Sequence, residues 1–279
     1  MSASARRLKA SFARDILAFL DCRSEAPGLA GLNRLIHACI RRVPWESVTR
    51  LLKRHAARDT ARCPRWPDEL WRDALVFNAG GTCFEINYAF FGLLNWLGYQ
   101  GYMTLNDMGD ARDCHAAIIV ILDGQKYLVD VSLPLSYAVA LRAETGAVLH
   151  APWLTYTAHP QAGGVYVIER SPHPRPYLFT LKDAPVAATA YERAVEDDYG
   201  PAGRFLDRVV INKVVGERAW LFNSAARPYR LEAFDRAGRR EVLLPCGDPA
   251  RSLADFYRMP ADKIAAALAF LPLAAGETI

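Results

Sequence analysis

Apolar residues recur at helical spacing through the first part of the chain. One stretch carries Leu8, Phe12, Ile16, Leu17, Phe19 and Leu20. A second stretch, residues 29–40, places its leucines, isoleucines and Cys39 on one face. Spacing near 3.6 residues is typical of amphipathic helices. We therefore expect helices over residues 8–60, punctuated by Pro27 and Pro44.

Residues 83–97, CFEINYAFFGLLNWL, are apolar on almost every side. A helix that is hydrophobic all round has to be buried. Gly98 follows at the position where a glycine often ends a helix. The sequence therefore predicts a central, buried helix that begins close to Cys83.

The pattern changes to strands from residue 115. Runs 116–122 and 125–131 are separated by Asp123-Gly124, a strong hairpin signal. Further strand candidates are 165–169, 177–181 and four runs within 204–245, and a helical pattern covers 252–270. Helices first, then strands, then a mixture favour an α+β architecture with a helical N-terminal layer.

Composition narrows the class of protein. The chain has 279 residues, 52% of them hydrophobic and 23% charged, and a net charge of +4, which is well short of a nucleic-acid-binding footprint. Six scattered cysteines form no zinc-type cluster, and no apolar run is long enough for a membrane span. We expect a cytoplasmic protein with reduced thiols and no bound metal, acting neither on nucleic acid nor in a membrane.

Positive charge gathers in two regions. Residues 1–60 carry twelve Lys/Arg against five Asp/Glu, and residues 204–240 carry nine against four. Such a basic surface could attract a polyphosphate such as coenzyme A. On charge alone, solvated helix faces explain it more simply.

The segment AGGTCFE, residues 79–85, builds an activated cysteine. Thr82 and Glu85 form a capping-box pattern, which places Cys83 at the first position of the helix. A thiol there lies at the positive end of the helix dipole, which stabilises a thiolate. Gly80 and Gly81 permit a sharp turn and the close approach of a substrate. Alternatively, Cys83 is a small buried core residue.

The hairpin supplies a base and its partner. If residue 122 faces 125, then 130 faces 117 and 132 faces 115. Because side chains alternate along a strand, His115 and Asp130 share a face as diagonal neighbours. A slip of one residue would separate them. His115 could then deprotonate Cys83, with Asp130 holding the imidazole.

These motifs resemble those of the arylamine N-acetyltransferases. AGGTCFEINYAFFGLLNWLGY is similar to their Gly-Gly-x-Cys-Phe-Glu segment, and HAAIIVILDGQKYLVDVSLP to their His-to-Asp hairpin. Weaker similarity covers RVPWESVTRL and GRFLDRVVINK. The resemblance implies a helical bundle (1–98), a β-barrel (99–200) and an α/β lid (201–279) around a papain-like Cys-His-Asp core.

The resemblance also implies a ping-pong reaction. Cys83 would take an acyl group from acyl-CoA, the co-substrate, and pass it to a small amine, with no bound cofactor. His115 would be the base and Asp130 its orienter. By resemblance alone, Trp45, Phe84 and Ser132 are expected in the substrate pocket.

The chain departs from the family pattern at several positions. Ala79 stands in place of an arginine, Trp45 and Ser47 replace a phenylalanine and an asparagine, and Ser132-Leu133-Pro134 replaces a glycine-containing stretch. The last change leaves open an amide synthase that takes an acyl chain from a carrier-protein thioester. A cysteine hydrolase or transglutaminase-like enzyme and a non-catalytic binding protein are further alternatives.

Overall fold

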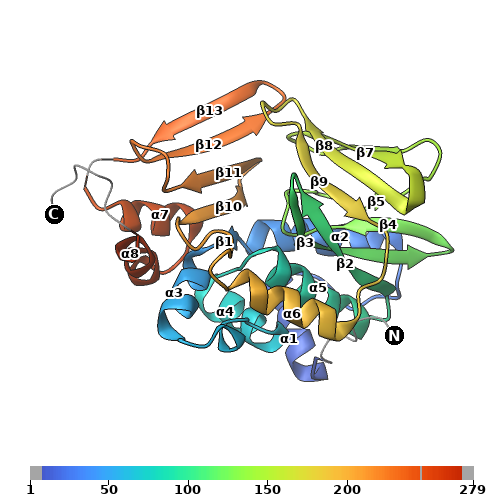
Figure 1. The fold of residues 1–279 in the computed structure, drawn as a ribbon, viewed down its shortest axis with the longest axis horizontal. Helices are drawn as coiled ribbons and strands as arrows, with labels where there is room; N and C mark the ends of the chain where they lie inside the picture. The colour runs from blue at the N-terminus through green and yellow to red at the C-terminus, as the bar shows by residue number, and fades with distance from the viewer. Residues whose placement is uncertain (1–7, 246, 272–279) are drawn as a thin grey trace.

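The structure, a computed structural model, describes residues 8–245 and 247–271. Its first part is a helical bundle (Figure 1). The helices are α1 (Ala10–Leu20), α2 (Leu29–Arg42), α3 (Val48–Ala56), α4 (Pro67–Phe77) and α5 (Cys83–Trp96), with the 3-10 turn η1 (Thr60–Arg62) between α3 and α4. Every residue of α5 from Cys83 to Leu94 is buried, which confirms the predicted central helix.

The sequence pattern did not predict α4. Its buried apolar side chains, Leu70, Trp71 and Ala74, cover less than two turns, so the helical period is short. Pro67 at the start of the helix and acidic residues in its first turn were the available signals.

The second part is an eight-stranded antiparallel sheet in the order β5-β4-β3-β2-β9-β8-β7-β6. Its two outer strands, β5 and β6, touch, so the sheet is a nearly closed barrel (Figure 1). The strands are β2 (Gln100–Met108), β3 (Ala111–Leu122), β4 (Gln125–Val129), β5 (Val139–Ala140), β6 (Ala147–His150), β7 (Thr155–Gln161), β8 (Val165–Ser171) and β9 (Tyr177–Lys182), with the turn η2 (Ala162–Gly164) before β8.

Strands begin earlier than the pattern indicated, at Gln100 instead of residue 115. In β2 the consecutive residues Tyr102, Met103 and Thr104 are all buried. A strand covered on both faces does not alternate between polar and apolar positions, so it lacks the period of two.

The predicted hairpin register is confirmed. Leu122 pairs with Gln125 and Ile118 with Val129. Asp123 and Gly124 both adopt positive φ, 49° and 77°, as a two-residue type I′ turn requires. His115 and Asp130 therefore lie on the same face of the ribbon.

The third part is a five-stranded antiparallel sheet in the order β1-β10-β11-β12-β13, packed against helices at the C-terminal end (Figure 1). Its outermost strand, β1 (Trp45–Glu46), comes from the first part of the chain and also bridges to Gly81. The remaining elements are α6 (Ala188–Asp198), β10 (Val210–Val215), β11 (Arg218–Asn223), β12 (Arg230–Asp235), β13 (Gly238–Leu243), α7 (Pro249–Tyr257) and α8 (Ala261–Ala269).

The bundle, barrel and α/β lid confirm the expected fold class. The division at residues 98 and 200 stays a prediction.

The single helical pattern at 252–270 is two helices, because Pro260 interrupts it. Within the described residues, no helix is both long and apolar enough to cross a lipid bilayer.

Candidate active site

Cys83 is the first residue of α5, as the capping pattern predicts, and its side chain is nearly covered at 8% exposure. Glu85 Oε2 accepts a bond of 3.4 Å from the Thr82 N–H. The reciprocal half of the capping box is loose, because the Thr82 hydroxyl has no hydrogen-bond partner among the described residues. The Cys83 Sγ lies 4.0 Å from the Cys114 carbonyl oxygen.

The two glycines before Cys83 serve a different purpose from the one expected. Neither Gly80 nor Gly81 has a positive φ. A Cβ on Gly80 would lie 1.6 Å from the Pro44 carbonyl oxygen, and a Cβ on Gly81 would lie 2.5 Å from Glu85 Oε2. The close approach that they allow is therefore that of neighbouring protein groups.

His115 and Asp130 meet as the hairpin register predicts. His115 Nε2 lies 2.7 Å from Asp130 Oδ2, and both side chains are buried. This bond occupies Nε2 and leaves Nδ1 for the thiol. Cys83 lies close enough to the imidazole to contribute to the raised pKa of His115. The structure thus brings together all three residues that the sequence singled out.

Asp130 is held by Asn87, which the sequence analysis did not single out, and by Ser132, which it expected in the substrate pocket. Its Oδ1 accepts from Asn87 Nδ2 at 2.9 Å, from the Ser132 hydroxyl at 2.6 Å and from the Ser132 N–H at 3.0 Å. Asn87 also donates to the Ala116 carbonyl at 2.7 Å and accepts from the Val131 N–H at 3.0 Å. Asn87 lies one helical turn after Cys83, so it joins the helix of the thiol to the strands of its partners. An amide among the buried, mostly apolar residues of this helix was the available signal.

Asn87→Ala is expected to destabilise the fold by about 1.5–3 kcal/mol, because it removes a donor to a buried carboxylate. Thermal unfolding of the variant measures this loss. The matched control is Asn95→Ala in the same helix, where the side chain is exposed and the change should stay within about 0.5 kcal/mol. Equal effects at the two positions would contradict the interpretation of Asn87 as a clamp.

The surroundings of His115 and Asp130 favour the charged form of both side chains. Burial alone would lower the pKa of His115, but the Asp130 carboxylate and the Cys83 thiol outweigh it and the pKa rises. Burial alone would raise the pKa of Asp130, but His115, Ser132 and Asn87 outweigh it and the pKa falls. An imidazolium beside a carboxylate is the state that this site stabilises.

This shift predicts a pH dependence of stability. A group whose pKa is raised on folding contributes its full stabilisation below the unfolded pKa and loses it as the pH rises. The advantage in melting temperature of the wild type over His115→Gln should be largest below about pH 6.5 and should shrink toward about pH 10. Melting curves of both proteins across this range measure it. An advantage that grows with pH would contradict the assignment.

The three expected pocket residues do not share one cavity. Trp45 and Ser132 line a very small cavity of about 10 Å³ together with Leu133 and Pro134. Phe84 lines a separate cavity of about 440 Å³ beside α6, with Cys114. The Ser132-Leu133-Pro134 segment thus lies against Trp45.

A larger cavity of about 530 Å³ lies between the barrel and the lid. Pro134 and Asn212 line both this cavity and the small one, so the two adjoin. Arg170 and Arg175 also line it, and neither has a carboxylate partner within the part of the chain that the structure describes.

Across the described ranges, no group of three His, Cys, Asp or Glu side chains could hold a metal ion.

Comparison with protein families finds one match, over residues 28–214, to the model described as N-acetyltransferase. The chain belongs to this N-acetyltransferase family. The match spans more than half of the chain, and the resemblance inferred from the sequence motifs is thereby confirmed. The protein is an arylamine N-acetyltransferase-like enzyme. Comparison with the curated proteins finds no match.

Solved structures of this N-acetyltransferase family share the fold. The arylamine N-acetyltransferase from Mycobacterium abscessus is 20% identical with a TM-score of 0.76, and the match covers 92% of this chain and 93% of that one. The Salmonella typhimurium enzyme is 16% identical with a TM-score of 0.75, covering 94% and 99%. An enzyme from Bacillus cereus with a Cys-His-Glu catalytic triad is 17% identical with a TM-score of 0.68, covering 88% and 97%.

Proposed function

We propose that this enzyme moves an acyl group from acyl-CoA to an amine through an acyl-enzyme on Cys83. The observation that supports this most directly is the contact of His115 with Asp130 at 2.7 Å beside the Cys83 thiol. A cysteine with a base and an orienting carboxylate is the arrangement of covalent acyl transfer.

In the first half of the reaction, the Cys83 thiolate attacks the carbonyl carbon of the thioester. The carbon–sulfur bond to coenzyme A breaks, and the departing thiolate takes the proton that His115 holds. In the second half, the amine nitrogen attacks the acyl-Cys83 carbonyl and gives its proton to His115. The bond to Cys83 then breaks, which releases the amide and restores the thiolate.

Backbone groups at the start of α5 suit the oxyanion that both steps form. The N–H groups of Cys83 and Phe84 have no hydrogen-bond partner among the described residues, as is usual for the first turn of a helix. Unpaired N–H groups next to the nucleophile stabilise a tetrahedral oxyanion. We assign these two groups as the donors.

The cavity between barrel and lid suits the donor. Two of the arginines that line it, Arg170 and Arg175, can bind phosphate in a bidentate manner. The cavity adjoins the segment that follows Asp130. We therefore expect the phosphates of coenzyme A near these arginines. The comparisons do not favour the alternative, an amide synthase that uses a carrier-protein thioester.

Intact-mass measurement after incubation with acetyl-CoA, without an amine, tests the proposal. We expect the mass gain of one acetyl group, located on Cys83 by peptide mapping, and its loss when an arylamine is added. Cys114→Ala should still be acetylated, and Cys83→Ala should not. A wild-type protein that stays unmodified with acetyl-CoA and with longer acyl-CoA donors would refute the proposal.

A further inference from the structure

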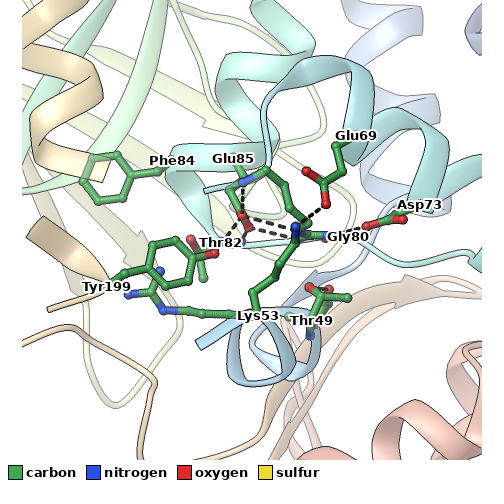
Figure 2. A network of polar contacts seen from close by, with 12 residues as sticks. Thr49, Lys53, Glu69, Asp73, Gly80, Thr82, Phe84, Glu85 and Tyr199 are labelled. Carbon is green, nitrogen blue, oxygen red and sulfur yellow. Dashed lines mark hydrogen bonds and ion pairs between the residues drawn. The ribbon is translucent and has the colours of Figure 1, made fainter. Parts of the chain in front are cut away.

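The Arg65 side chain is buried beneath the start of α5, with 2% exposure. Its guanidinium donates to Glu85 Oε2 at 2.9 Å, to Glu85 Oε1 at 3.3 Å, to the Gly80 carbonyl at 2.5 Å and to Asp73 at 3.1 Å. Figure 2 shows Gly80, Glu85 and Asp73 gathered in this polar network. One cation thus meets groups from three segments of the chain.

The contacts bracket the nucleophile along the chain. Gly80 lies three residues before Cys83, and Glu85 lies two residues after it. The packing is close enough that a Cβ on Gly81 would lie 2.7 Å from Arg65 Nη2. A single planar guanidinium therefore fixes both sides of the segment that carries Cys83. A lysine ammonium group lacks this planar arrangement of several donors.

The same guanidinium balances the buried negative charge of Glu85, two residues after Cys83. Glu85 and Glu46 are both fully buried, and Arg65 is the cation that most favours the ionised form of each. If a neutral residue replaced Arg65, a thiolate at Cys83 would form two residues away from a buried Glu85 carboxylate that had lost its main counter-charge. Like charges in a low dielectric disfavour each other strongly.

Ala79 adds a reason to single out this residue. It precedes Gly80 and carries no charge. In this chain the guanidinium next to the Gly80 carbonyl comes from a loop before α4 instead.

We propose that Arg65 is a positioning residue for Cys83: it fixes residues 80–85 and neutralises the buried Glu85 carboxylate, which would otherwise oppose ionisation of the thiol. The inference rests on Cys83 being the nucleophile, as proposed above. Arg65 acts through Glu85 and Gly80 and does not contact the substrate.

The experiment follows the alkylation rate of Cys83 by iodoacetamide as a function of pH, with the modified peptide identified by mass spectrometry. In Arg65→Gln the midpoint of the rate profile should move upward by about one pH unit or more, because the buried Glu85 carboxylate then lacks its main counter-charge. Arg65→Lys should give an intermediate midpoint, because the positive charge remains while the planar set of guanidinium donors is lost.

Arg50→Gln is the matched control. Arg50 is as buried as Arg65 and forms an ion pair with Asp198 at 2.8 Å, but it contacts the carbonyls of Asp198 and Arg204 and none in residues 80–85. Arg50 also favours ionised Glu85, but less than Arg65 does, so its replacement should lower the melting temperature and move the alkylation midpoint of Cys83 less than Arg65→Gln does. A midpoint that moves equally in both glutamine variants would reduce Arg65 to a general stabilising role.

Two further outcomes separate this inference from the proposed function. An unchanged midpoint in folded Arg65→Gln overturns the inference but leaves the acyl-enzyme intact. A wild-type Cys83 that is unreactive near neutral pH overturns the proposed nucleophile itself. If Arg65→Gln does not fold, Arg65→Lys decides, and a midpoint equal to that of the wild type rejects the proposal.

Discussion

His115→Ala should slow the acetylation of Cys83 by acetyl-CoA about 10²–10⁴-fold, because the thiol loses its general base. The imidazole lies 2.7 Å from Asp130 and is buried, so bulk water does not readily replace it. Stopped incubations analysed by intact mass give the acetylation rate directly. Raising the pH should restore part of the rate, since hydroxide then generates the thiolate.

The control for this prediction is His159→Ala. His159 is half-exposed and pairs with Glu169 at 3.2 Å on the barrel, in a comparable imidazole–carboxylate contact. Its replacement should leave the acetylation rate unchanged. Equal rates for wild type and His115→Ala would remove the imidazole from the mechanism and leave Cys83 to be activated by the helix alone.

Glu85→Gln should destabilise the folded chain by about 3–5 kcal/mol, because it leaves the buried Arg65 cation without its main counter-charge. Both partners are about 1% exposed, and Glu85 also accepts from the Tyr199 hydroxyl at 2.8 Å. Burial alone would raise the pKa of Glu85, but Arg65 and Tyr199 keep it low, so the wild-type pair stays charged. Thermal or urea unfolding measures the loss.

Glu69→Gln is the matched control for this second prediction. Glu69 pairs with Lys53 in the same region (Figure 2), but both side chains are roughly one-third exposed. Solvent screens such a pair, so its loss should cost no more than about 1 kcal/mol. If the two glutamine variants unfolded at the same temperature, the buried pair would not be the stabilising contact that its geometry indicates.

The chemistry of the site could be read from local sequence rules. A capping pattern placed Cys83 at a helix start, and a two-residue turn fixed the register that joins His115 to Asp130. Both rules act over a few residues, where turn geometry leaves little choice. The family resemblance then extended this local reasoning to the three-part fold.

The supporting residues could not be read in the same way. Asn87, Ser132 and Arg65 matter through contacts with segments up to 45 residues away, such as the bond of Asn87 to Ser132. Contacts between distant segments leave no periodic pattern in the sequence. A polar residue in a buried helix indicates only that some hydrogen-bond partner exists. Helix α6 was missed for a related reason, since only Tyr191 and Val195 of it are buried.

The two-residue strand β1 joins the N-terminal helical part of the chain to the lid sheet. Its backbone is the outer edge of the lid sheet, opposite Ile211 and Asn212, yet it belongs to the segment that also bridges to Gly81. A fragment made of residues 201–279 alone would therefore expose the hydrogen-bonding row of β10. Such an open edge recruits another strand, so the excised lid should self-associate. During synthesis, the chain emerges from its N-terminus, so β1 is made before β10, the strand of the lid with which it pairs.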